Sequence, residues 1–510
     1  MNNSPSKFYL YGDVVSLSVL EGVGEKVFLV GSSFGNQNFG DILQLKNTAK
    51  FYRQLGRFNS VAVFNANDIG DFQFPGFACK AFGVDAIVFV SSLPLSGLDV
   101  GAGLLPVRIV RNVEVLHLYG GGFLNDMWGD FVLSVTEHFL ELLKPQTYVV
   151  SGQQITPPFE SRVLHHIQAY NPVLFSVRDG FSEKLLAGKG YKPEYSFDDA
   201  TEALLNLADK FSLKRAPGLL LHINSSDYTG NVTSSQGLIS ELKALAASSD
   251  SYNKVTVFQA FADRRIEIVD TRESIKQLER FFPFTDYRFV ELAFLACGLG
   301  TRPIEPFQGD FGYSCSYHFA LWLQLSGIPC WLRVSNPYYW QKAAALQVKQ
   351  DFVSYLRDPY LADHKSNLDQ RHKWLMQLSH VISDAPSEHR VCEIVDSGNV
   401  SSPWRFKGNA SSESREVPDQ LAARVNEMGS ELQLERQRTE RAELASFESA
   451  NRLEQVQKDL ALARLHNQSI LQSSSWRLTG PLRFLARMLR NEVAPQKKVR
   501  ATEDDEGPIS

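Results

Sequence analysis

The sequence contains few cysteines for its length, and no two of them form a C-x-x-C pair. The five are scattered along 510 residues: Cys79, Cys297, Cys315, Cys330 and Cys392. Paired cysteines are typical of zinc and redox sites, and dense cysteine frameworks are typical of small secreted domains. The pattern argues against both and predicts a protein of a reducing compartment without a metal site.

The chain also lacks a long apolar run and a large excess of one charge. No stretch reaches the roughly 18 to 20 apolar residues that a membrane-spanning helix needs. Residues 1–7 are polar, and no apolar segment typical of a signal peptide follows them. The net charge of −5 predicts no general attraction to nucleic acid. We therefore expect a cytoplasmic protein with no nucleic-acid partner.

The most informative segment is a short apolar strand that continues into a loop of glycine and asparagine. Residues 27–30 are apolar, Gly31, Gly35 and Gly40 follow, and helical spacing of apolar residues starts at Ile42. Glycine lets a ligand approach the backbone, and the amides at a helix N-terminus bind anions. The segment predicts either an anion site or an ordinary turn of a doubly wound sheet.

Four segments, in the same order, resemble the motifs of polysaccharide pyruvyl transferases. Residues 38–41 match an N-x-G-D loop, and residues 118–126 match a second glycine loop. Residues 175–182 match an S-x-R-D-x-x-S segment, and residues 197–200 match the Asp-containing stretch after it. Residues 317–320 with 327–329 match an R-x-H-a … G-v-P segment. The resemblance covers residues 25–345. It implies an enzyme that forms a pyruvate ketal on a sugar of a surface polysaccharide, with phosphoenolpyruvate as donor and no cofactor.

The pattern of apolar residues predicts an α/β fold. Strands are expected at residues 27–30, 61–64, 86–90, 115–119, 147–150 and 174–177, separated in part by amphipathic helical segments. Their continuous apolar runs are typical of parallel strands covered on both faces. The pattern restarts at Pro217. We predict two Rossmann-like domains, residues 26–216 and 217–382, facing a cleft; the resemblance implies the same glycosyltransferase-B-like architecture.

Three flanking regions have a different composition. Residues 1–25 are predicted to be an N-terminal extension, and residues 383–417, poor in apolar side chains, a linker. Residues 418–472 keep a strict 4-3 spacing, which predicts a coiled coil with a polar centre. We expect this coil to make a homodimer; a single solvated helix is the alternative.

The C-terminal end of the chain is basic and then acidic. Arginines alternate with leucines and aromatic residues in residues 473–491, and this segment resembles tails of bacterial enzymes that build surface polysaccharides. It predicts a basic amphipathic helix that either lies on the inner face of a membrane or docks on a protein. Residues 492–510 are predicted to be a disordered tail.

Two residues are predicted to be catalytic. An anionic donor needs guanidinium groups and backbone donors to bind it. Arg178 follows a predicted strand, so it lies at the carboxyl end of the sheet; the alternative is a pair with Asp179 that braces the loop. His318 is the acid/base candidate because an imidazole exchanges protons near neutral pH, although a structural role is open. Asp179 is expected to cap the helix after it.

The residues predicted to bind substrate come from the glycine loops and from the turn before His318: Asn38, Gly40, Asp41, Gly121, Gly122, Asn125, Asp126 and Ser316. The glycines allow close backbone approach, and Asn125 and Asp126 offer polar groups to sugar hydroxyls. A helix cap is the alternative for Asp41. Asp198 and Asp199 are interpreted as structural, and the His165–His166 pair as exposed on a helix rather than metal-binding.

The chain departs from the family motif at Ser316, where the family has an arginine. A serine carries no charge, so an anion contact of about 2 kcal/mol is missing; Arg302 and Arg333 are candidates to replace it. Three hypotheses remain open. They are a pyruvyl transferase that acts on a saccharide or lipid-linked saccharide, a nucleotide-sugar glycosyltransferase, and a catalytically weak sugar-binding scaffold in polysaccharide biosynthesis.

Overall fold

The structure is a computed structural model in which the following residues are described: 8–31, 38–66, 75–92, 104–126, 128–211, 213, 215–224, 235–248, 254–260, 286–292, 296, 307–348, 351–384 and 389–394. All of them belong to the first of two compact units, Met1–Lys407. The predicted coiled coil (418–472), basic segment (473–491) and acidic tail (492–510) lie outside the described residues, as does Arg302.

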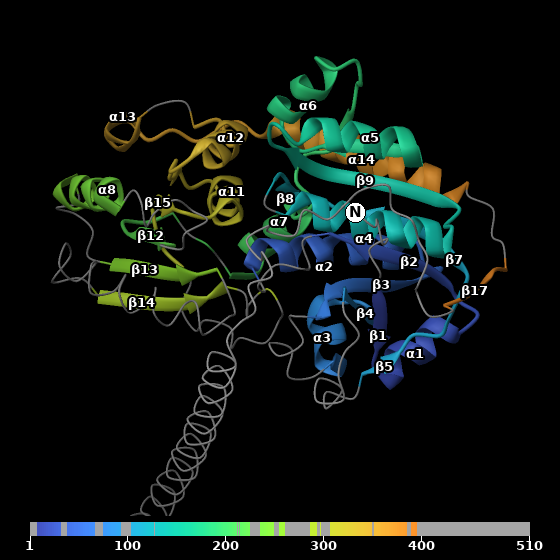
Figure 1. The fold of residues 1–510 in the computed structure, drawn as a ribbon. Coiled ribbons are helices and arrows are strands. Elements are labelled where there is room, and N and C mark those ends of the chain that lie inside the picture. The colour runs from blue at the N-terminus through green and yellow to red at the C-terminus, as the bar shows by residue number, and fades with distance from the viewer. Residues whose placement is uncertain are drawn as a thin grey trace, which may run out of the picture. The chain divides into compact units, whose positions relative to one another are not determined.

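A large, mostly parallel sheet forms the first half of this unit (Figure 1). Its strand order is β11-β10-β9-β7-β2-β3-β4-β1-β5, with β8 beside β9. The strands are β1 (Tyr9–Gly12), β2 (Glu25–Val30), β3 (Phe58–Asn65), β4 (Ala86–Ser91), β5 (Leu105–Pro106), β7 (Val113–Leu118), β8 (Gly121–Leu124), β9 (Thr147–Ile155), β10 (Leu174–Val177) and β11 (Glu194–Tyr195). Only β1 runs antiparallel to its neighbours β4 and β5. The α/β fold with a large parallel sheet predicted from the apolar runs is confirmed.

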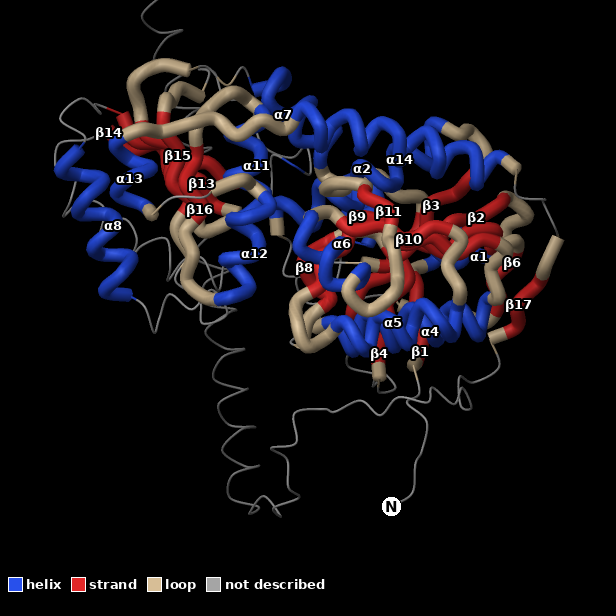
Figure 2. Tube along the Cα trace, turned by 90° about the horizontal axis from the view of Figure 1, so that it is seen from above, coloured by secondary structure: helices blue, strands red, loops and turns tan. Residues whose placement is uncertain are grey.

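Helices cover both faces of this sheet (Figure 2). Alternate residues of one strand supply the two faces: Val27 and Leu29 of β2 pack in one apolar cluster, Phe28 and Val30 in the other. The first cluster includes α2 (Phe39–Gln54), α7 (Thr201–Phe211) and α14 (Lys365–Ser383). The second includes α4 (Gly129–Leu143), α5 (Glu160–Tyr170) and α6 (Gly180–Ala187).

A smaller, fully parallel sheet follows, in the order β14-β13-β12-β15-β16. Its strands are β12 (Leu219–His222), β13 (Lys254–Gln259), β14 (Asp286–Glu291), β15 (Phe311–Ser314) and β16 (Cys330–Leu332). Leu219 and Leu221 pack against α8 (Ser235–Ser248) and α13 (Phe352–Arg357), while Leu220 faces the cluster that includes α11 (Tyr317–Leu325). Helix α12 (Pro337–Ala345) follows β16.

Two flanking regions differ from the prediction. The predicted extension 1–25 contains β1, which joins the large sheet, and α1 (Val14–Glu21), whose Leu20 is buried. The predicted linker 383–417 contains β17 (Val391–Glu393), which pairs antiparallel with β6 (Ile109–Arg111). Strands of three or four residues are too short to show a periodic pattern, so composition alone did not indicate them.

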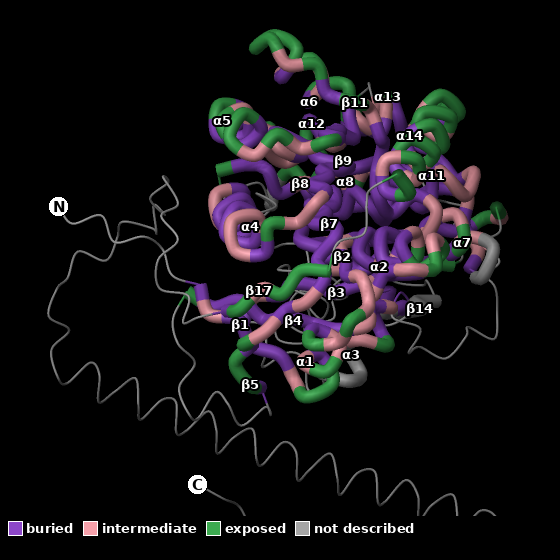
Figure 3. Tube along the Cα trace, turned by 90° about the vertical axis from the view of Figure 1, so that its right-hand side faces the viewer, coloured by how far each residue is buried: buried purple, intermediate pink, exposed green. Residues whose placement is uncertain are grey.

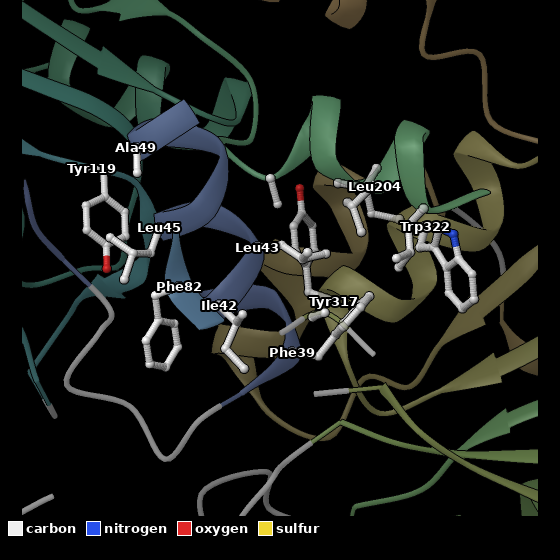
Figure 4. Close-up of a cluster of buried hydrophobic side chains, with 14 of the residues drawn as sticks. Phe39, Ile42, Leu43, Leu45, Ala49, Phe82, Tyr119, Leu204, Tyr317 and Trp322 are labelled. Carbon is white, nitrogen blue, oxygen red and sulfur yellow. The ribbon is translucent and has the colours of Figure 1, made fainter. Parts of the chain in front are cut away.

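One apolar cluster contains residues of both sheets. Phe39 of α2 lies 6.2 Å, between ring centroids, from Trp322 of α11, and Figure 4 shows Leu43 and Tyr317 in the same cluster. The strands are the most buried part of the unit (Figure 3).

The predicted boundary at Pro217 falls between β11 and β12. The division into two domains facing a cleft stays a prediction. Among the described helices, none has the length and apolar character needed to cross a membrane.

Candidate functional site

Arg178 comes directly after β10 and is almost completely buried, with 1% of its surface exposed. Its Nη1 lies 3.0 Å from Oδ2 of Asp198, and its Nη2 donates to Oε1 of Gln154 in β9. Its Cζ lies 4.3 Å from the centre of the Tyr317 ring. Burial disfavours the charge, but Tyr317 and Asp198 outweigh burial and raise the pKa of Arg178. Arg178 is therefore a fixed cation.

His318 is the second residue of α11 and is also buried. Its Nε2 lies 3.3 Å from the same Oδ2 of Asp198 that Arg178 contacts. Burial alone would raise the pKa of Asp198, but interaction with the His318 imidazole and the charge of Arg178 hold it well below its usual range. The two residues predicted to be catalytic therefore meet at one carboxylate, which the sequence had suggested was only structural.

Gly40, at the start of α2, lies directly against the His318 ring. A Cβ at this position would overlap the Nδ1 side of the imidazole. Asn38 is the N-cap of α2, and its side chain accepts a hydrogen bond from the Gly40 amide at 2.8 Å. Asp41 lies in the first turn and is not the cap, so the alternative proposed for Asp41 is wrong. The N-x-G-D loop thus packs against the His318 ring.

The second glycine loop contacts Arg178. A Cβ at Gly122 would lie 2.9 Å from Nη2 of Arg178 and 2.7 Å from the Tyr338 hydroxyl. The Gly122 carbonyl accepts a hydrogen bond from that hydroxyl at 2.6 Å. Gly121 pairs with Gln153 of β9, next to Gln154. The loop needs glycine because Arg178 and Tyr338 occupy the space of a side chain.

The structure gives less support for substrate binding by the other residues that were predicted for it. Asn125 is buried, and its side chain donates to the Gly122 carbonyl at 3.0 Å and accepts from the Trp128 amide at 3.3 Å, so it braces the loop. Asp126 is exposed. Ser316 is the N-cap residue of α11, but its side chain makes no capping bond. Asp179 caps α6, as predicted, through hydrogen bonds to the amides of residues 181 and 182.

A second buried network lies next to Asp198. Asp199 Oδ2 accepts from the Gly120 amide at 2.6 Å and from the Ser151 hydroxyl at 2.5 Å, and its Oδ1 lies 2.5 Å from Nη1 of Arg371. Arg371, from α14, also forms a two-bond contact with Glu202. Adjacent aspartates therefore serve different arginines, and Asp199 positions the glycine loop.

Arg333, one of the two candidates for the missing family arginine, is engaged elsewhere. Arg333 is buried against α8 and pairs with Glu241 at 2.9 Å, and Arg302 is not described. A lysine that the sequence did not point to, Lys342, lies against Tyr338 and feels the charge of Arg178. Nζ of Lys342 is 4.0 Å from the ring centre of Tyr338, whose hydroxyl contacts the Gly122 loop. Burial and the charge of Arg178 lower the pKa of Lys342 to about 7. The four-residue spacing of Tyr338 and Lys342 in the sequence could have indicated that these two side chains meet on one helix face.

Exposed aromatic side chains take part in two ring contacts, one of which involves Tyr338. Among the described residues, the aromatic side chains with a large exposed fraction are Trp128 (38%), Phe181 (37%) and Trp340 (53%). The Trp128 ring lies 6.2 Å from that of Tyr338, and Phe181 lies 6.0 Å from Trp340. In the part of the chain that the structure describes, no group of three or more His, Cys, Asp or Glu is arranged to hold a metal ion.

Comparison with known proteins gives only distant matches. No protein-family model and no curated protein matches the chain. Three solved structures are similar at 10% identity over 72% of this chain. They are a Listeria monocytogenes protein assigned as a UDP-N-acetylglucosamine 2-epimerase (TM-score 0.39, 92% of that chain), a Rickettsia africae glycosyltransferase (0.35, 100%) and S. aureus MnaA with UDP (0.35, 100%). A likeness this low carries no information on the activity of the present chain.

Proposed function

We propose that this chain is a transferase that moves a group from a phosphorylated, anionic donor to a saccharide hydroxyl, with Arg178 and His318 at its centre. The observation that carries the proposal is the meeting of both residues at Oδ2 of Asp198. A buried carboxylate beside an imidazole orients the ring, which suits a residue that takes a proton from a hydroxyl and returns it. Arg178 supplies a permanent positive charge next to it.

The first candidate reaction is pyruvyl transfer from phosphoenolpyruvate, as the family resemblance implies. The enol carbon forms bonds to two hydroxyl oxygens of one sugar, while its bond to the phosphate oxygen breaks. The two hydroxyl protons go to the methylene carbon, which becomes a methyl group, and to the departing phosphate. His318 would relay a proton, and Arg178 would stabilise negative charge on the donor.

The second candidate is glycosyl transfer from a sugar nucleotide, and Ser316 favours it. An uncharged residue stands where the pyruvyl transferase family has an arginine, and Arg333 is engaged with Glu241. A cluster with fewer fixed cations suits a donor whose diphosphate is bound by backbone amides. The third hypothesis, a catalytically weak scaffold, predicts sugar binding without turnover.

The exposed aromatic residues support a binding place for the acceptor saccharide: Trp128, Phe181 and Trp340. Aromatic faces pack on the apolar faces of sugar rings, and Tyr338 connects Trp128 to the Gly122 loop. We expect the saccharide to bind there. Dimerisation by the coil and contact of the basic segment with a membrane or a protein remain proposals.

The decisive experiment is a thermal-shift screen of the full chain with phosphoenolpyruvate and with several sugar nucleotides. A ligand that binds the folded chain raises its melting temperature by an amount that grows with the ratio of ligand concentration to Kd. Stabilisation by phosphoenolpyruvate, together with ketal formation that His318→Gln abolishes, is the expected result. His372→Gln, an exposed histidine of α14, is the matched control. A response to sugar nucleotides alone rejects pyruvyl transfer, and no response to either donor class rejects a transferase. Gain of ketal formation in Ser316→Arg would indicate a weakened pyruvyl transferase.

A further inference from the structure

Lys342 is a cation beside the candidate site that the family motifs do not include. It lies in the last turn of α12, where its Nζ is 4.0 Å from the ring centre of Tyr338 and 5.0 Å from that of Tyr339. Both contacts follow from helical spacing of four and three residues. Aromatic faces attract a cation but satisfy none of its hydrogen-bond donors. The ammonium group therefore has donors to offer to a ligand.

The position of Lys342 relative to Arg178 follows from the contacts of Tyr338. The Tyr338 hydroxyl bonds to the Gly122 carbonyl, and the space above Gly122 is bounded by this hydroxyl and by Nη2 of Arg178. Lys342 is half-buried, whereas Arg178 is 1% exposed. Of the two cations, Lys342 is thus the more exposed.

We propose that Lys342 binds the phosphate group of the donor and supplies the positive charge that Ser316 lacks. This inference rests on the proposed function, since it assumes a phosphorylated donor at the same site. An ammonium on a flexible stem is a common phosphate ligand, and its three donors need no fixed orientation. Binding pairs the lysine with an anion and relieves its repulsion from Arg178.

The charge state of Lys342 makes this role depend on pH. The groups that face it are the phenols of its own helix, the cation at the end of β10 and two carboxylates: Tyr338, Tyr339, Arg178, Asp41 and Asp198. Its pKa is lowered to about 7, while the pKa of Arg178 is raised and that of Asp198 is lowered, so those two stay charged. The ammonium form is present below pH 7 and is lost above it. Donor affinity should therefore fall by up to about tenfold between pH 6 and pH 8.

The test begins with the unmodified full chain. Trace acetic anhydride labels only neutral amines, and mass spectrometry gives the extent of labelling of each lysine between pH 6 and pH 9. Lys342 should label with a midpoint near pH 7, and the exposed Lys373 of α14 serves as the internal control. Phosphoenolpyruvate, a UDP-sugar and inorganic pyrophosphate are then added separately. At least one of them should slow labelling of Lys342 and leave that of Lys373 unchanged.

Variants complete the test. Lys342→Met should weaken binding of the protecting ligand about tenfold or more, the usual size of a charged hydrogen bond. Lys342→Arg should keep the affinity at pH 6 and lose the decline toward pH 8, with Lys373→Met as control. Because the phosphate itself titrates near pH 6, variants are compared at each pH. The inference is overturned if no probe slows labelling, or if Lys342→Met binds as tightly as the wild type. Protection by pyrophosphate alone supports Lys342 as a phosphate ligand and rejects the proposed function.

Discussion

The carboxylate of Asp198 lies 3.3 Å from Nε2 of His318, and the same oxygen lies 3.0 Å from Nη1 of Arg178. Asp198 has no exposed surface, so its charge is balanced only by neighbouring protein groups. Removal of the carboxylate would leave the buried Arg178 cation without its ion-pair partner. The geometry of the cluster therefore depends on Asp198 as much as on the two residues it joins.

Asp198→Asn should destabilise the fold strongly at neutral pH. The change keeps the shape but removes the charge, and loss of one partner of a buried pair costs about 3 to 5 kcal/mol. The pKa of Asp198 is lowered in the folded state. Its contribution is therefore present above the unfolded pKa, about 3.9, and is lost as the pH falls below it. Urea unfolding at several pH values should show a large difference from wild type at pH 7 that shrinks below pH about 4. The exposed Asp369 of α14 provides the control, Asp369→Asn, and equal stability of Asp198→Asn and wild type at pH 7 would contradict the assignment.

Gly40→Ala should displace His318. A Cβ at residue 40 overlaps the imidazole, and both residues are held by helices packed in one apolar cluster. Overpacking of this kind costs about 1 to 3 kcal/mol, and the altered ring position should abolish the response to the donor. Gly180→Ala is the matched control, because a Cβ at Gly180, also at the start of a helix, meets no atom within 4 Å. The measurements are chemical denaturation and donor-induced thermal shift. If Gly40→Ala responded to the donor as Gly180→Ala does, donor binding would not depend on the position of the His318 ring.

Arg178 was predicted to lie at the carboxyl end of a sheet because it follows a predicted strand. His318 was selected because it matches the histidine of the family motif and an imidazole exchanges protons near neutral pH. Arg178 follows β10, and His318 follows β15 by way of a short turn. The glycine loops were predicted because glycines that follow an apolar strand let a ligand approach the backbone. Glycines 40 and 122 pack against His318 and Arg178, respectively.

Sequence did not indicate the role of Asp198 or of Lys342, since neither residue type in isolation reveals what packs against it. His318 is 120 residues from Asp198 in the chain, and no local spacing connects them. The prediction that His165 and His166 are both exposed was half wrong. His166 is fully buried, with its Nε2 2.6 Å from the Tyr148 hydroxyl and its Nδ1 2.8 Å from Glu137. Adjacent positions of a helix differ by about 100°, so only the helix phase could show which histidine faced the core, and that phase was not assigned from the sequence.

Trp340→Ala and Trp128→Ala should weaken binding of the acceptor saccharide without affecting the donor. Both side chains are exposed, so their removal should change the free energy of unfolding by less than about 0.5 kcal/mol. A lost aromatic contact of about 1 kcal/mol corresponds to roughly fivefold weaker binding. Titration calorimetry with oligosaccharides gives the acceptor affinity, and the donor thermal shift tests independence. Met376→Ala, which removes an exposed apolar side chain from α14, should leave both unchanged. Unchanged acceptor affinity in both tryptophan variants would place the saccharide elsewhere.

Arg371→Met should destabilise the unit and also weaken donor binding, although Arg371 does not contact Arg178 or His318 in the described structure. Its guanidinium bonds to Asp199 and Glu202, and loss of the cation would leave Asp199 buried without its partner, at a cost of about 3 to 5 kcal/mol. Asp199 also accepts from the Gly120 amide at 2.6 Å, so a shifted carboxylate would move the loop that carries Gly122. Arg357→Met, at an exposed arginine of α13, is the control. Urea denaturation measures the first effect and titration with the donor, at a temperature where both variants are folded, measures the second. If Arg371→Met lost stability but bound the donor normally, Asp199 would stabilise the fold without positioning the glycine loop.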